Sequence, residues 1–276
     1  MEHLKFDNIK VSNFEGAFHG MRNPKNSWRL SDSAFGFTTN SRILTDFCDE
    51  IAESYLDRQH TDFYTKVDYL QHNGIKCANV DEEVYEYNLI GAKDMKLAQR
   101  LIRGGSEHRK FLRQIQVCVD ITAPLYWWKE FDTYKIGTVA NSTSTMHKLA
   151  ETPITRDCFL LDKANDELNM CEDDLYVSFG SCIDELINLC EKLRQKYLET
   201  KDIRYWRALI QLLPNAWVQT RTVTMSYENL LAMCSVSQRR FHKLFEWRED
   251  FIGFARGLPY AQDLIFLDEI VEDKNS

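Results

Sequence analysis

The stretch from Leu112 to Lys135 limits the possible folds of this chain more than any other part of the sequence. Its first half alternates apolar and polar residues, the period of a strand with one buried face. The apolar, β-branched positions are Ile115, Val117, Val119 and Ile121. Ala123-Pro124 follows, and Pro suits the first turn of a helix because its missing N–H has no partner there. We therefore predict a strand that passes directly into a helix over 125–135.

The predicted helix is strongly aromatic and is followed by a polar segment. Its large side chains are Tyr126, Trp127, Trp128, Phe131 and Tyr134. We expect them to form a contact between subunits of an oligomer, unless they pack inside one chain. Gly137 is expected to break the helix, and a loop rich in Ser and Thr follows it. This loop is either an ordinary surface loop or a ligand-binding loop on a rigid support.

The remaining pattern predicts helices without a regular alternation of strands and helices. We expect helices over 44–55, over 94–102, from a capping box at Ser181 and Asp184, from near Ser226, and over 238–255. The first forty residues favour loops with short strands, and the acidic segment 151–180 favours a solvated insertion. These features indicate the α+β class.

Composition excludes several classes of protein. The 276 residues are 44 % hydrophobic and carry a net charge of −8, which permits a large core and disfavours a broad nucleic-acid surface. The polar start resembles no signal peptide, and the apolar runs are shorter than the roughly 20 residues of a membrane span. The eight cysteines form no C-x-x-C pair, which argues against a zinc site and for reduced thiols in the cytoplasm.

Short motifs give weaker signals. The sequence contains neither the glycine fingerprint of a dinucleotide-binding fold nor a P-loop. Gly104-Gly105-Ser106-Glu107-His108 is by itself typical of a turn after a helix. Arg221 lies in a mostly apolar stretch and needs either an acidic partner or a bound anion. The basic group at 239–243 is either a solvated helix face or a phosphate-binding site.

Taken in order, these pieces resemble the flavin-dependent thymidylate synthases over roughly 104–149 and 205–247. That family has a Glu-His pair before a strand, then Ala-Pro and an aromatic helix ending in Arg-His-Arg, then a polar loop. Glu107-His108 and Ala123-Pro124 match these features, and LLPNAWVQTRTVTMSYENLL and FHKLFEW resemble later family segments. Thr133-Tyr134-Lys135 replaces Arg-His-Arg, while Glu130, Ser142 and Met146 replace a family Gln, Glu and Arg.

The resemblance implies a single domain over 1–276, with a central mixed sheet flanked by helices, and a set of site residues. Those expected to bind the flavin are His108, Thr133, Tyr134, Lys135, Asn141, Arg239 and His242. Those expected to bind the nucleotide are Glu130, Ser142, Ser144 and Arg221. Ser144 is expected to orient the nucleotide without attacking it, because this family requires no enzymic nucleophile.

The resemblance also implies an activity, namely the reductive methylation of dUMP to dTMP. FAD is the expected cofactor, with methylenetetrahydrofolate and NADPH as co-substrates and a homotetramer as the expected assembly. Two alternatives stay open, since the Arg-His-Arg motif is replaced. The chain is either a non-catalytic protein that binds a nucleotide or a partner on the same scaffold, or a flavin enzyme that modifies another pyrimidine nucleotide.

Overall fold

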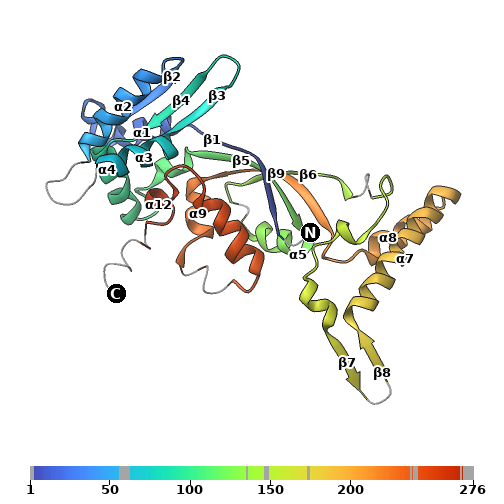
Figure 1. Ribbon diagram of the computed structural model, residues 1–276. Helices are drawn as coiled ribbons and strands as arrows, with labels where there is room; N and C mark the ends of the chain where they lie inside the picture. The colour runs from blue at the N-terminus through green and yellow to red at the C-terminus, as the bar shows by residue number, and fades with distance from the viewer. Residues whose placement is uncertain are drawn as a thin grey trace.

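The computed structural model describes residues 3–55, 63–134, 136–145, 149–172, 175–236, 238, 242–267 and 269. It belongs to the α+β class, as predicted, with a four-stranded sheet in the middle of the molecule (Figure 1). A helix with the length and apolar character needed to cross a membrane does not occur among these residues.

The central sheet alternates in strand direction. Its strands, in spatial order, are β1 (Lys5–Ser12), β5 (Gln116–Pro124), β9 (Val218–Ser226) and β6 (Val139–Ser142). Each neighbouring pair is antiparallel. The prediction of a mixed sheet is therefore wrong. The strand order explains this difference: β5 and β6 run in the same direction, but β9 lies between them and prevents parallel pairing.

The strand–helix prediction at 112–135 is confirmed in its main features. Strand β5 buries every second side chain, and helix α5 (Leu125–Phe131) follows it at once, with a short 3₁₀ turn over Asp132–Tyr134. Trp127, Trp128 and Phe131 are buried within this chain, where they pack with Trp247 and Phe251. The alternative that we allowed for these rings therefore holds: they pack inside one chain.

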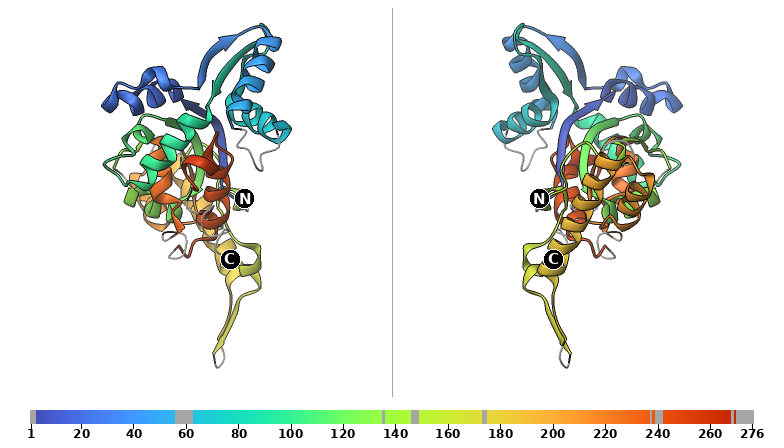
Figure 2. Two further views of the ribbon diagram at one scale, coloured as in Figure 1. Left: turned by 90° about the vertical axis from the view of Figure 1, so that its left-hand side faces the viewer. Right: turned by 90° about the vertical axis from the view of Figure 1, so that its right-hand side faces the viewer.

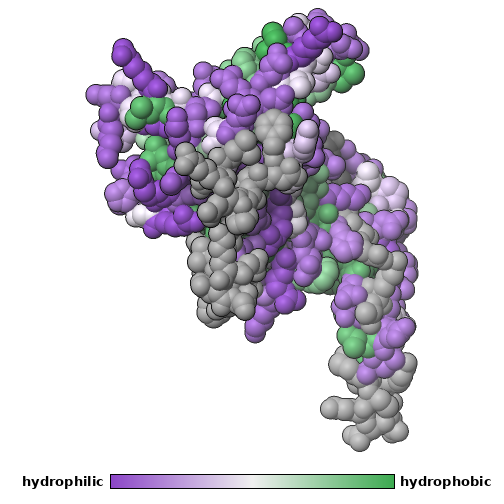
Figure 3. Space-filling model, turned by 60° about the vertical axis from the view of Figure 1, so that its left-hand side comes forward, coloured by the Kyte–Doolittle hydropathy of each residue, from purple (hydrophilic) through white to green (hydrophobic). Residues whose placement is uncertain are grey.

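The N-terminal third adds a second, smaller sheet. Strands β2 (Ala34–Thr38), β4 (Val84–Leu89) and β3 (Ile75–Asn79) form it, beside helices α2 (Ser41–Ser54) and α3 (Phe63–Gly74). In Figure 3, hydrophobic side chains are visible among hydrophilic ones at this end of the molecule. The predicted helices over 44–55 and 94–102 are confirmed as α2 and α4 (Ala92–Arg103).

Helix α1 (Phe14–Arg22) lies where we expected loops and short strands. Its buried side chains, Phe14, Ala17, Phe18 and Met21, recur at helical spacing. The buried guanidinium of Arg22 joins α1 to α4 through the fully buried Asp94, with Nη2 and Oδ1 2.5 Å apart.

Residues 149–217, which we call the arm, extend away from the central sheet (Figures 1 and 2). The arm contains the hairpin β7 (Asn169–Glu172) and β8 (Leu175–Ser178), then helices α7 (Phe179–Thr200) and α8 (Ile203–Leu212). The hairpin lies within the segment expected to be irregular. Helix α7 begins at Phe179 after Ser178, so the predicted capping box at Ser181 is wrong. Asp184 instead pairs with Arg156.

The C-terminal part packs on the central sheet. Helix α9 (Tyr227–Met233) begins with a capping box formed by Ser226 and Asn229, near the predicted start. A π-helical turn over Trp247–Phe251 leads into α11 (Ile252–Arg256), and α12 (Ala261–Leu264) follows. The helix predicted over 238–255 is confirmed from Phe245 onward, whereas residues 242–244 are not helical.

Candidate functional site

Two of the predicted flavin-binding residues, Thr133 and Tyr134, line one cavity of about 590 Å³. The end of α5, the start of β5 and helix α9 bound this cavity. The other lining residues are Arg113, Gln116, Ile136, Gly137, Ser226, Glu228, Asn229, Ala232 and Met233. A cavity of about 660 Å³ lies beside Tyr126. Lys243 of the basic group at 239–243 lines it, but none of the residues that the family resemblance assigned to the flavin or the nucleotide does. The cavity at Tyr134, which we call the Tyr134 cavity, is therefore the candidate site.

Hydrogen bonds fix Tyr134 in place. Its hydroxyl lies 3.1 Å from Nε2 of His242 and 3.3 Å from Oε1 of Gln238. The His242 ring stacks on Trp247, with ring centroids 4.2 Å apart and planes 7° from parallel. Trp247 also lies beside Tyr134, so the stacking holds His242 near the end of α5. His242 is 108 residues from Tyr134 in sequence, and spacing alone could not pair the two.

Burial shifts the acid–base properties of both side chains. It lowers the pKa of His242, although the charge of Glu130 acts in the opposite direction. Burial, with a further contribution from Glu130, raises the pKa of Tyr134. Both groups are therefore neutral near pH 7. Because the Tyr134 hydroxyl donates its one proton to Oε1 of Gln238, the Nε2–H of neutral His242 can donate a hydrogen bond to the hydroxyl oxygen.

Arg113 supplies positive charge to the Tyr134 cavity, and the sequence analysis did not select it. Its side chain is exposed. The guanidinium makes a long hydrogen bond, 3.5 Å from Nη2 to the carbonyl oxygen of Ser106. The nearby carboxylate of Glu228 is already paired with Arg109, whose Nε lies 2.9 Å from Oε2. The cation of Arg113 is thus available to an anion while Glu228 is neutralised. No motif pointed to Arg113, because only the tertiary fold brings it beside α9.

Asn229 shapes the cavity wall and is already fully engaged. Its side-chain oxygen accepts hydrogen bonds from the Ser226 backbone N–H and hydroxyl, and its nitrogen donates to the carbonyl oxygen of Ile136. Gly137 has a φ of 81°, a left-handed conformation that favours glycine, and it packs against Asn229. These contacts hold the segment after α5 against α9, so the cavity wall is rigid on this side.

The expected nucleotide loop is in part an edge strand. Asn141 and Ser142 lie in β6 opposite Thr222 and Arg221, and both are exposed. Ser142 is therefore five residues along β9 from Ser226 at the cavity wall, or roughly 16 Å at about 3.3 Å per residue. Ser144 follows the strand and is half-buried. Within a single chain, these three residues therefore lie apart from the Tyr134 cavity.

Arg221 has an acidic partner inside the chain. Its Nη1 lies 2.8 Å from Oδ1 of Asp132, and its guanidinium stacks on Trp128 at 4.2 Å from the ring centroid. Its Nε also donates to the side-chain oxygen of Gln219. The structure thus provides the ion pair that was one of the two explanations for this arginine.

The other predicted residues have different positions. Glu130 accepts a hydrogen bond from the Thr133 hydroxyl through its backbone oxygen and does not line the cavity. His108 is exposed in the turn before β5 and does not line the cavity either. Lys135 and Arg239, together with Met146, lie outside the described residues.

No family model and no curated protein matches this sequence. Solved structures do match its fold. Thymidylate synthase X from Helicobacter pylori, solved with FAD and dUMP, superposes with a TM-score of 0.53 and 13 % identity over 97 % of this chain and 98 % of that chain. A second structure of the Helicobacter pylori flavin-dependent enzyme with FAD and dUMP gives 0.53 and 14 % identity, covering 97 % and 99 %.

A further match comes from a different methylase. The UMP/dUMP methylase PolB from Streptomyces cacaoi, bound with 5-Br dUMP, gives a TM-score of 0.51 and 12 % identity over 97 % of this chain and 96 % of that chain. These likenesses extend over almost the whole of each chain. The chain therefore has the fold of the flavin-dependent thymidylate synthases, as the sequence resemblance implied.

Proposed function

We propose that this chain binds FAD and a pyrimidine nucleotide and carries out the reductive methylation of dUMP to dTMP. The observation that carries the proposal is the fold, which covers 97 % of the chain in matches to structures solved with FAD and dUMP. Methylenetetrahydrofolate would be the carbon donor and NADPH the reductant. We further propose a cytoplasmic homotetramer, in line with the family that the sequence resembles.

The residues of the Tyr134 cavity fit part of a flavin or nucleotide. A volume of about 590 Å³ lies in the usual range for ligand sites, and Met233, Ala232 and Ile136 give it apolar walls for a planar ring. Arg113 can form a bidentate contact with one phosphate. A second phosphate would need a cation from outside the described lining, and Lys135 and Arg239 are the residues we propose for it.

Bound FAD, once reduced, would supply the hydride of the reaction. The chain's own contribution is to bind and orient. His242 and Gln238 hold the Tyr134 hydroxyl at the end of α5, which fixes the ring that forms one cavity wall. Thr133 is likewise fixed, because its hydroxyl donates to the carbonyl oxygen of Glu130 at 2.7 Å. A pre-formed wall lowers the entropy lost when a ligand binds.

We propose that the edge strand β6 carries the nucleotide contacts. Asn141, Ser142 and Ser144 present amide and hydroxyl groups, which recognise base and sugar edges by hydrogen bonds. Ser144 would orient the nucleotide. These groups lie roughly 16 Å along the sheet from the Tyr134 cavity. We therefore propose that the complete site includes residues of a second subunit.

Two measurements test this proposal. The absorbance spectrum of the purified protein, titrated with FAD, should show a bound-flavin band, and Arg113→Gln should weaken FAD binding by about ten- to a hundredfold, the effect of losing one charge-assisted contact. Lys110→Gln is the matched control, because Lys110 is also exposed and lies in the same turn but does not line the cavity. Release of tritium from C5 of labelled dUMP, with FAD, methylenetetrahydrofolate and NADPH present, reports the methylation itself.

One observation favours a second candidate, a binding protein without catalysis. Asp132 already neutralises Arg221, so a cation expected to hold the substrate is engaged within the chain. A protein that binds dUMP without a flavin band and without tritium release would establish this candidate. Release of tritium from another pyrimidine nucleotide, with none from dUMP, would instead identify a different substrate of the same chemistry.

A further inference from the structure

The arm leaves apolar side chains uncovered on its two helices. Its own small core consists of Leu149, Ile154, Phe159, Ile187, Cys190 and Leu209. Helix α8 buries only Leu209 among its ten residues, although its sequence is IRYWRALIQL. Leu189 on α7 is 45 % exposed and Ile203 on α8 is 55 % exposed. An extended pair of helices with this much exposed apolar surface is typical of an interaction site.

Two sides of α7 carry apolar residues near Leu189. One stripe, Ile183, Ile187, Cys190 and Arg194, faces the core of the arm, and Leu193 also packs against that core. The other stripe comprises Cys182, Leu186 and Leu189, spaced by four and three residues. This spacing places the second stripe along one side of the helix, as in helices that pair along a seam. Cys182 and Leu189 are exposed, while Leu186 is half-buried.

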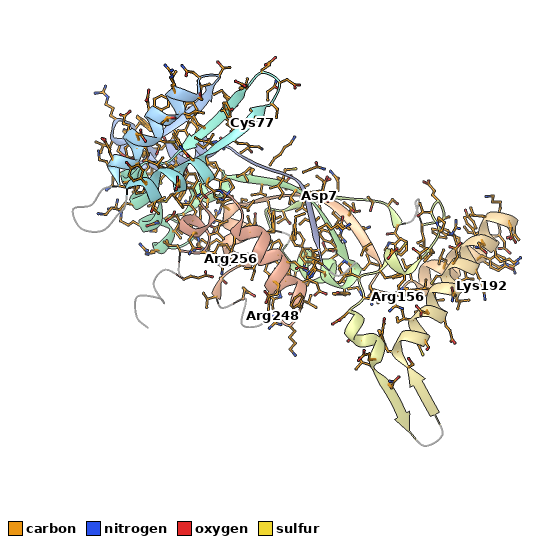
Figure 4. The ribbon with its side chains drawn as sticks, viewed as in Figure 1. Asp7, Cys77, Arg156, Lys192, Arg248 and Arg256 are labelled. Carbon is orange, nitrogen blue, oxygen red and sulfur yellow. The ribbon has the colours of Figure 1, made fainter. Side chains whose placement is uncertain are left out.

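The charged residues of α7 indicate what covers this stripe. Most of them are paired within the chain: Asp184 with Arg156, Glu191 with Arg194, and Lys196 with Glu199. Glu185 and Lys192 are exposed, and neither has an ion-pair partner among the described residues. Both lie on the same flank of the second stripe, Glu185 about one turn before Leu189 and Lys192 about one turn after it. Figure 4 places Lys192 on the arm, far from the central sheet.

Opposite charges on either side of a central leucine suit a second copy of the same helix. In an antiparallel pair with its two-fold axis at Leu189, Glu185 lies within one residue of the level of the partner's Lys192. The symmetry repeats this contact, so both unpaired charges gain partners. A parallel pair would set like charges level with each other and gain no attraction. The charge pattern therefore selects one occupant and one orientation.

We propose that α7 pairs antiparallel with α7 of a second copy of this chain, with Leu189 at the two-fold axis. The inference rests on the arm alone and does not depend on the proposed function. It also moves the subunit contact away from the aromatic helix α5, whose rings are buried within their own chain. Helices α7 and α8 of the arm project away from the central sheet (Figure 1).

Disulfide trapping in the full chain tests the position of the axis. Leu189→Cys should form a covalent dimer on mild oxidation, because the two Leu189 positions face each other across the axis. Leu198→Cys is the matched control: Leu198 is also exposed, at 39 %, but nine residues along α7 it points to the opposite side. Both variants carry Cys77→Ser and Cys182→Ser to remove exposed native thiols. Equal cross-linking of the two variants, or none for Leu189→Cys, overturns the proposal.

A charge exchange tests the orientation. Glu185→Lys and Lys192→Glu should each weaken dimerisation by about tenfold in sedimentation equilibrium, since two exposed pairs are lost and repulsion replaces them. The double variant should restore the wild-type affinity, because it restores opposite charges across the axis. Additive weakening in the double variant would overturn the antiparallel arrangement, as would a wild-type chain that stays monomeric at micromolar concentration. Circular dichroism confirms that each variant remains folded.

Discussion

The central body and the arm bury their apolar side chains to very different degrees. Around β5 and α5 the body forms one continuous core, in which the rings of Trp127, Trp247 and Phe251 are fully buried. The arm has a core of six buried side chains and leaves Leu189 and Ile203 exposed. The arm therefore depends on a much smaller core than the body does. We expect substitutions in the two regions to differ in how much stability they remove and in how far through the structure their effect spreads.

The largest effect is expected in the body. Trp127→Ala should reduce the free energy of unfolding by roughly 3–5 kcal/mol, because it opens a cavity among several packed rings. Chemical denaturation measures this change. A loss below about 1 kcal/mol would show that the core is loosely packed and would remove the contrast with the arm.

Two tryptophan-to-phenylalanine variants refine this expectation. The Nε1 of Trp127 is buried without a hydrogen-bond partner among the described residues, whereas Nε1 of Trp128 donates to the carbonyl oxygen of Gln219 at 2.9 Å. Trp127→Phe should therefore destabilise the protein less than Trp128→Phe, by about 1 kcal/mol. Equal losses would mean that the Trp128 hydrogen bond contributes nothing to stability.

A smaller effect, confined to the arm, is expected for Leu209→Ala. The loss should be about 2–3 kcal/mol, near the lower end for a buried leucine, because a small core can relax around the gap. Hydrogen exchange should show faster exchange in α7 and α8 and unchanged exchange in β5 and β9. Faster exchange throughout the sheet would show that the arm and the body unfold as one unit.

Acid should loosen the arm before the body. Arg194 donates hydrogen bonds to Glu191 and lowers the pKa of that carboxyl from 4.5 to about 2. A carboxyl with a lowered pKa stabilises the folded state above its unfolded pKa, so this contribution should disappear as the pH falls from about 4.5 to about 2. Glu191 also accepts the backbone N–H of Ile154, which ties the loop of the arm to α7.

Hydrogen exchange or near-ultraviolet dichroism, followed against pH, measures the acid effect. Glu191→Gln should remove the pH dependence and leave the arm less stable at pH 7. Glu199→Gln is the control, because the Glu199–Lys196 pair is largely exposed. The same acid transition in Glu191→Gln would assign it to other carboxylates.

The smallest effect is expected at the ion pair between Asp132, in the turn after α5, and Arg221 in strand β9. Asp132→Asn should cost only about 0.5–1 kcal/mol of stability, since the Asp132 side chain is 42 % exposed. It should also leave the charge of Arg221 uncompensated and strengthen the binding of dUMP, which calorimetry measures. Unchanged dUMP affinity would show that Arg221 serves the fold alone.

Much of the body could be predicted because the pattern of its residues is local. The alternation at Ile115, Val117, Val119 and Ile121, followed by Pro124, predicted the change from strand to helix that the structure confirms. Helix α1 carried a comparable signal in Phe14, Ala17, Phe18 and Met21, but Gly16 and Gly20 lower helix propensity and hid it. Packing on the core compensates for these glycines.

The candidate site was harder to predict, because contacts between distant residues build it. Thr133 and Tyr134 followed from the family resemblance, yet their neighbours Arg113 and Asn229 come from other elements and carry no motif. The hydroxyl-rich segment was expected to be a loop, and its residues Val139–Ser142 pair with β9 instead. Pairing with an open strand edge satisfies backbone groups that a loop would leave to water, and local sequence cannot show that such an edge exists.

Local sequence patterns were enough to predict the class of this protein, the order of its main strand and helix, and the family whose fold it has. These features depend on periodicity and on short motifs, which act over a few residues. The packing of distant elements was needed to show that the aromatic rings of α5 are buried in their own chain, that Asp132 neutralises Arg221, and that Leu189 on α7 is exposed. Burial and charge pairing depend on which distant elements meet in space, and no local pattern specifies that meeting.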